Sequence, residues 1–135
     1  MCRSIKKLRL PERPPTDEEL HAASLQFARS KGDVLVVGLN SDRSTRGLKG
    51  PGRPVIPQSD RASLLAAFEA VDYVVIFDQA TPAELIERVR PDVLVKGEDY
   101  KGREVVGRRH AGRVELAPLV KGISTSEIIR RIRQL

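Results

Sequence analysis

Short, continuous apolar runs alternate along this chain with segments that open on helix-capping residues. The first run, Val34 to Leu39, is rich in β-branched residues and lies between Gly-Asp and Asn-Ser-Asp. Such a run is typical of a strand buried on both faces. Similar runs follow at 73–77, 93–95 and 114–116. Because strands that alternate with helices form parallel sheets, the pattern predicts an α/β fold with a Rossmann-like, doubly wound parallel sheet.

The segments between these runs carry helix signals. Thr81 to Glu84 has the form of a capping box with proline at the first helical position, and Pro91 would end that helix. From Asp60 to Ala70 apolar residues recur at helical spacing, with Leu64, Leu65 and Phe68 on one stripe. Two more capping boxes, Thr16–Glu19 and Ser124–Glu127, predict a helix before the first strand and another at the end of the chain.

The beginning of the chain has a different composition. Residues 1–15 hold three prolines and five basic residues, and they make a poor central strand because proline cannot donate a ladder hydrogen bond. We therefore expect a basic, proline-rich segment at 1–15 and one domain at 16–135. The sheet is expected to lack its first central strand or to carry an atypical one.

Charge and composition narrow the functional classes. The net charge is +6, but much of the excess lies near the two ends, and the aromatic residues number only two Tyr and three Phe. Both features argue against a nucleic-acid-binding module, because the charge is not gathered on one surface and few aromatic rings are present to stack on unpaired bases. No apolar run approaches the roughly 18 to 20 residues that span a bilayer, and the start lacks a signal peptide, so we expect a cytoplasmic protein without membrane contact. The single Cys2 predicts neither a disulfide nor a metal site.

Three polar clusters follow strands or open a helix, at residues 40–42, 96–100 and 122–126. In a parallel sheet the carboxyl ends of the strands meet at one edge, and ligands bind in the crevice there. The clusters therefore predict one site for a nucleotide or a phosphorylated sugar.

Several stretches carry a family resemblance in a consistent order, at residues 32–42, 48–54, 60–61, 91–100 and 122–129. Together they resemble the small nucleotidyltransferases of the cytidylyltransferase superfamily, and most closely the sugar-1-phosphate adenylyltransferase domains of ADP-heptose synthesis. Leu119 and Val120 stand where the glycerol-phosphate cytidylyltransferases usually carry Arg-Thr, which favours ATP over CTP.

The resemblance breaks at the start of the chain. The family's His-x-Gly-His motif falls on Glu18, Glu19, Leu20 and His21, so only the second histidine is present. A carboxylate at Glu18 would face the triphosphate, and like charges at about 4 Å repel by several kcal/mol when partly desolvated.

The resemblance implies transfer of AMP from Mg²⁺-bound ATP to a sugar 1-phosphate, with release of pyrophosphate. It implies catalytic roles for His21 and Lys49 and no metal site in the protein itself. It further implies nucleotide or phosphate binding by Asn40, Asp42, Arg61, Ser124, Thr125 and Ser126, and substrate binding by Lys96, Gly97 and Asp99. Arg61 also has a physical argument, because a cation in the first turn of a helix is unfavourable unless an anion lies nearby.

Simpler interpretations remain open. Ser124 could cap the last helix, and Asp42 could cap the short segment after its strand. Lys49 could be a solvated charge, and Asp99 could shape a plain turn. The alternative functions are CTP-dependent transfer to a polyol or amino-alcohol phosphate and a non-catalytic nucleotide-binding remnant. Unpaired sheet edges would further favour a homo-oligomer.

Overall fold

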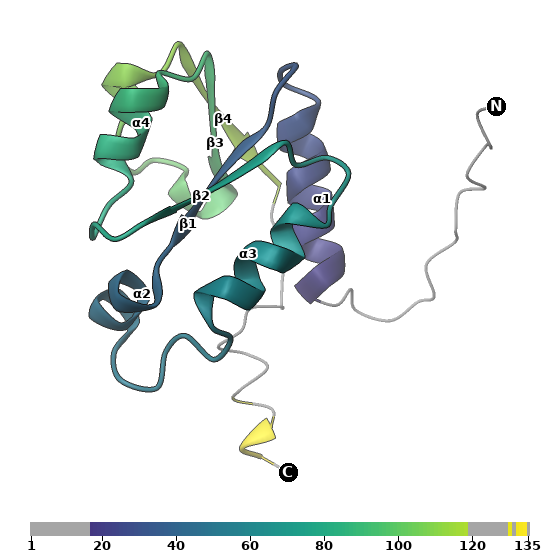
Figure 1. Cartoon of the computed structure of the whole chain (residues 1–135). Coiled ribbons are helices and arrows are strands. Elements are labelled where there is room, and N and C mark those ends of the chain that lie inside the picture. The colour runs from purple at the N-terminus through teal and green to yellow at the C-terminus, as the bar shows by residue number, and fades with distance from the viewer. Residues whose placement is uncertain (1–16, 119–129, 131, 135) are drawn as a thin grey trace, which may run out of the picture.

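The structure is a computed structural model that describes residues 17–118, 130 and 132–134 (Figure 1). Helices and strands alternate along it, as the sequence predicts. The elements are α1 (Asp17–Arg29), β1 (Val36–Asn40), α2 (Asp42–Lys49), α3 (Gln58–Ala66), β2 (Tyr73–Phe77), α4 (Ala83–Val89), β3 (Val93–Gly97), η1 (Glu98–Tyr100), η2 (Arg108–His110) and β4 (Arg113–Ala117).

The four strands form two separate parallel pairs. β1 pairs with β2 from Val36 opposite Tyr73 to Asn40 opposite Phe77. β3 pairs with β4 from Val93 opposite Arg113 to Gly97 opposite Ala117. The predicted α/β class with parallel strands is therefore confirmed. The strands do not form one continuous sheet, and among the described residues no strand joins the two pairs. The segment in which the sequence placed a poor central strand, residues 1–15, lies outside the described part.

Helices lie on both sides of the strands (Figure 1). α3 packs against β1 and β2, and α1 contacts β4. α4 approaches β1 at Gly38, where an added Cβ atom would lie 2.9 Å from the Leu85 Cδ2 atom. Glycine at this strand position thus gives the Leu85 side chain the space of a missing methyl group.

One predicted helix start was wrong, and one helix was not predicted. The Thr81 capping box does not form: the N-cap of α4 is Pro82, which has no side-chain cap, and the Glu84 carboxylate instead accepts a hydrogen bond from Gln79 Nε2 at 2.6 Å. The sequence reading also gave no helix at 42–49, where α2 lies. Since α2 has almost no apolar residues, hydrophobic periodicity could not reveal it.

The core among the described residues is small. The buried apolar side chains are Phe77, Ile86, Val105 and Ala117. Leu64, expected on a buried stripe, is 56% exposed, and Val34, expected in the first strand, is 61% exposed and precedes β1. The Leu35 carbonyl accepts hydrogen bonds from the amides of both Asp72 and Tyr73, so regular pairing begins only after it. No helix in the described part of the chain is long and apolar enough to cross a membrane.

Candidate functional site

Ser41 organises the turn from β1 into α2. Its side chain is buried, at 3% exposure, and its Oγ atom accepts a hydrogen bond from the Ser44 amide at 3.1 Å. Ser41 is therefore the N-cap of α2, and Asp42 is the first helical residue rather than the cap. The Ser41 amide donates to the Phe77 carbonyl at 2.9 Å, which ties the turn to the end of β2.

The segment after β2 also forms hydrogen bonds with this turn. Ser41 Oγ donates to Asp78 Oδ1, and Ser44 Oγ donates to the Gln79 carbonyl at 2.7 Å. Asn40 Nδ2 in turn donates to Ser44 Oγ at 3.0 Å. The sequence reading missed Asp78 and Gln79, although they directly follow a predicted strand and obey the same rule that singled out Asn40. They fix the carboxyl ends of β1 and β2 relative to one another.

Arg61 and Asp42 form an ion pair at the same edge. Arg61 Nη2 donates to Asp42 Oδ1 at 2.8 Å, and Arg61 Nε donates to the Ile56 carbonyl at 3.0 Å. The Asp42 amide donates to Gln58 Oε1 at 2.8 Å. Thus a nearby anion does accompany Arg61, as its place in the first turns of α3 indicated, and that anion is the Asp42 carboxylate. Phosphate binding by Arg61 and Asp42 stays a prediction.

A second polar group lies at the end of β3. The Lys96 ammonium lies over the Tyr100 ring, 5.5 Å from its centre. Burial lowers the pKa of Lys96 from its ordinary value of 10.5, and the nearby Asp99 carboxylate partly opposes that shift. Gly97 has ordinary extended backbone angles, so the fold at this point does not itself demand glycine. Lys96, Asp99 and Tyr100 therefore form one local cluster, and their role in binding substrate remains a prediction.

The remaining predicted residues are placed as follows. Lys49 is the last residue of α2 and is exposed, and His21 lies within α1. Ser124, Thr125 and Ser126 lie outside the described residues. The structure brings Asn40, Asp42 and Arg61 together. Asn40 bonds to Ser44, whose amide bonds to the Ser41 cap. Asp42 bonds to Gln58 through its amide and to Arg61 through its carboxylate. Among the described residues, no hydrogen bond connects this group with the Lys96 cluster, which belongs to the other strand pair.

Residues 19–131 match the family model described as "Cytidylyltransferase-like". The chain belongs to the cytidylyltransferase-like family. The match covers most of the chain, including both strand pairs and the carboxyl ends of β1 and β3, where the Asp42 and Lys96 groups lie. This confirms the nucleotidyltransferase superfamily that the sequence motifs indicated.

Curated relatives of this cytidylyltransferase-like chain share one name. It is 58% identical over 113 residues to "Bifunctional protein HldE" of Nitratiruptor sp. and 57% identical over 113 residues to that of Campylobacter fetus. The protein of the same name from Helicobacter pylori is 49% identical over 114 residues. Each of these matches takes in 84% of the chain, whereas the chain spans only about a quarter of the relatives' length. The comparison therefore concerns one part of a longer bifunctional protein.

Proposed function

We propose that this chain is a nucleotidyltransferase domain that transfers AMP from ATP to a sugar 1-phosphate of the heptose type and releases pyrophosphate. The observation that supports the proposal most strongly is the family match over residues 19–131, together with relatives named bifunctional protein HldE at up to 58% identity. Leu119 and Val120, in place of Arg-Thr, favour ATP over CTP.

The reaction needs positioning and charge stabilisation more than covalent chemistry. An oxygen of the sugar 1-phosphate attacks the α-phosphorus of ATP, and a new P–O bond forms. The bond from the α-phosphorus to the bridging oxygen breaks, and pyrophosphate leaves with the electron pair. Protein groups assist by holding the reactants in line and by placing positive charge near the phosphate oxygens.

Residues of this chain suit those tasks. In the proposal His21 and Lys49 stabilise charge on the phosphate oxygens. Ser124, Thr125 and Ser126 bind nucleotide phosphate at the start of the helix that the sequence predicts there. The ion pair with Asp42 fixes the orientation of the Arg61 guanidinium group near the end of β1, where the guanidinium can bind the nucleotide. Lys96 and Asp99 face the acceptor sugar phosphate. Loss of a proton from the half-buried Lys96 would weaken its hold on the acceptor's phosphate.

Mg²⁺ would enter with the nucleotide. Within the described residues, no group of three or more His, Cys, Asp or Glu side chains could hold a metal ion. The Asp42 carboxylate, which lies just after β1, already forms an ion pair with Arg61. We therefore treat Mg²⁺ as part of the ATP substrate, bound mainly by phosphate oxygens.

A non-catalytic nucleotide-binding domain is the second candidate, and two observations favour it. Glu18 and Leu20 stand where the family has histidine and glycine, and the described strands form two pairs without a strand between them. An electrostatic conflict of several kcal/mol would lower the rate by orders of magnitude, because each ~1.4 kcal/mol changes the rate about tenfold.

One assay separates the two candidates. We would measure pyrophosphate release from ATP and from CTP with heptose 1-phosphate and Mg²⁺. The original chain would be compared with a Glu18→His/Leu20→Gly variant, which restores the motif. Turnover of ATP by the original chain supports the transferase. Saturable ATP binding by calorimetry without turnover supports the non-catalytic domain, and turnover with CTP alone would reassign the nucleotide.

A further inference from the structure

Strand β2 presents apolar side chains to solvent along an edge that no described strand covers. It pairs with β1 on one side, and within the described residues no strand lies on its other side. Tyr73 is 62% exposed and Ile76 is 42% exposed, and no other described strand has a large apolar side chain as exposed as these. The unpaired N–H and C=O groups of such an edge can bind a further strand.

The exposure of these two side chains comes from the edge of the strand pair rather than from one uncovered face. Successive side chains of a strand point to opposite faces, so Tyr73 and Ile76, three positions apart, lie on different faces. Phe77 shares the face of Tyr73 and is 8% exposed, and Val74 shares the face of Ile76 and is half-buried. Both faces are thus covered at neighbouring positions. What the exposed side chains lack is a strand beside β2.

The other strands carry features that oppose pairing with another chain, and β2 does not. On β4, Arg113 and Glu115 form an ion pair at 3.2 Å, and charged side chains on an edge strand disfavour a further strand. Strand β3 contains Lys96. Strand β1 contains Gly38 and Asn40, two residue types with low β-propensity. The sequence of β2 is Tyr-Val-Val-Ile-Phe, without charge or glycine, so its edge is the one suited to pairing.

We infer that the open edge of β2 is an interface at which a second copy of this chain adds its own β2 in antiparallel orientation. A two-fold axis at Val75 makes the strand complementary to itself. Tyr73 then lies opposite Phe77 of the second copy, and Val74 lies opposite Ile76 of the second copy, so that apolar and aromatic side chains form all the cross-strand pairs. The inference does not depend on the proposed nucleotidyltransferase activity.

The aspartates on either side of β2 set the ends of this pairing. In the same register Asp72 would lie opposite Asp78 of the second copy, and like charges that face each other are unfavourable. Both carboxylates have partners in their own chain, because Asp72 forms an ion pair with Arg29 at 2.8 Å and Asp78 accepts a hydrogen bond from Ser41. The Arg29 guanidinium reduces the negative charge at each end. We therefore expect the two strands to pair over residues 73–77 and to separate beyond them.

Disulfide cross-linking tests the register on the full chain. The Cys2→Ser/Val75→Cys variant carries a single cysteine, at the two-fold axis. Directly opposite Cα atoms of antiparallel strands lie about 4.5 to 5.5 Å apart, a separation that a disulfide can span. Oxidation should therefore produce a cross-linked dimer, detected by electrophoresis without reductant.

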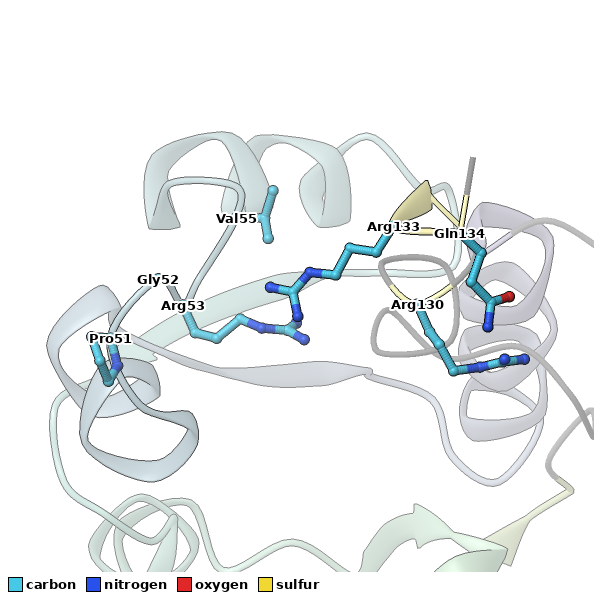
Figure 2. Close-up of a pocket in the computed structure, with 7 residues that line it drawn as sticks. All are labelled: Pro51, Gly52, Arg53, Val55, Arg130, Arg133 and Gln134. Carbon is cyan, nitrogen blue, oxygen red and sulfur yellow. The ribbon is translucent and has the colours of Figure 1, made fainter.

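The matched control for cross-linking is Cys2→Ser/Leu64→Cys, which places the thiol on α3 at a position that is 56% exposed. Val55 is equally accessible but is unsuitable, because it lines a hollow with Arg53 and Arg133, as Figure 2 shows. The control should cross-link about tenfold more slowly, because only pairing at β2 raises the effective concentration of the two thiols. Equal rates in the two variants would overturn the inference.

Sedimentation velocity at increasing protein concentration measures the association itself. The original chain should shift from monomer to dimer, and Ile76→Lys, which places a cation on the edge of β2, should weaken the dimer about tenfold. Leu64→Lys makes the same charge change on α3 and should leave association within about twofold of the original. A chain that stays monomeric at every concentration, or an equal loss in both lysine variants, would refute the interface. If Ile76→Lys alters the far-UV spectrum, the comparison of the two cysteine variants decides the question.

Discussion

Replacing Ser41 with alanine should destabilise the protein far more than its small size suggests. The change removes two hydrogen bonds of one buried hydroxyl, the one accepted from the Ser44 amide and the one donated to Asp78. Loss of an N-cap costs about 1 kcal/mol. Ser44 is only 5% exposed, so its amide would be left without water, and an unsatisfied buried donor costs about 1 to 3 kcal/mol. Because the two costs overlap, we expect a total loss of about 2 kcal/mol.

Urea unfolding followed by far-UV circular dichroism measures this loss. Ser59→Ala is the matched control, because Ser59 is exposed and, within the described part of the chain, its hydroxyl donates a hydrogen bond only to the adjacent Asp60, at 3.4 Å. The control should stay within about 0.5 kcal/mol of the original protein. Asp78→Ala should cost less than half as much as Ser41→Ala, since Asp78 is exposed and the Ser41 cap survives without it. Equal losses for Ser41→Ala and Ser59→Ala, at an unchanged denaturant slope, would refute the reasoning.

Three further predictions follow from the same structure. Between the lowered pKa of Lys96 in the folded chain and its ordinary value of 10.5, the unfolded chain binds more protons than the folded one, so stability should rise with pH across that window. The Lys96→Met variant should be more stable than the original protein at pH 7, and its stability should rise less with pH. Urea unfolding at several pH values from 7 to 10 would show both effects. Asp72 accepts hydrogen bonds from Arg29 Nη1 and from the Leu35 amide, both at 2.8 Å. Asp72→Asn should cost only about 0.5 to 1 kcal/mol because the ion pair is exposed, and Asp72→Ala more because the amide also loses its acceptor, with chemical denaturation comparing the two. Among the described strands, both pairs have open edges, which predicts a melting temperature that changes with protein concentration. A sharp transition independent of concentration would contradict this.

The strands could be predicted because their signal is local and strong. All four apolar runs became strands, with ends shifted by no more than about two residues. The shift at Val34 has a physical cause, since the Leu35 carbonyl and amide bond to Asp72 before regular pairing begins. Helix α2 lacked an apolar stripe, and only its Ser41 cap could have indicated it.

The candidate site was predictable where a local rule applied. The position of Arg61 beside a helix start correctly indicated a neighbouring anion, but the identity of that anion as Asp42 depends on how the start of α3 is placed beside the start of α2. Asp78 could have been found by the rule that found Asn40. The apolar runs could not predict that the strands form two separate pairs. A strand that pairs with one other strand has the same apolar pattern as a strand that pairs with two.

The two strand pairs differ in the number of residues that separate their paired strands, and this difference bears on folding during synthesis. Val93 and Arg113 are about 20 residues apart, whereas Val36 and Tyr73 are about 37 apart. Closing the longer loop costs only about 0.5 kcal/mol more, because the entropy grows with the logarithm of loop length. Synthesis at about 5 to 20 residues per second leaves a few seconds between completion of β2 at Phe77 and completion of β4 at Ala117. Neither pair contains a strand from the other, so the amino-terminal pair can close while the carboxyl-terminal pair is still being translated.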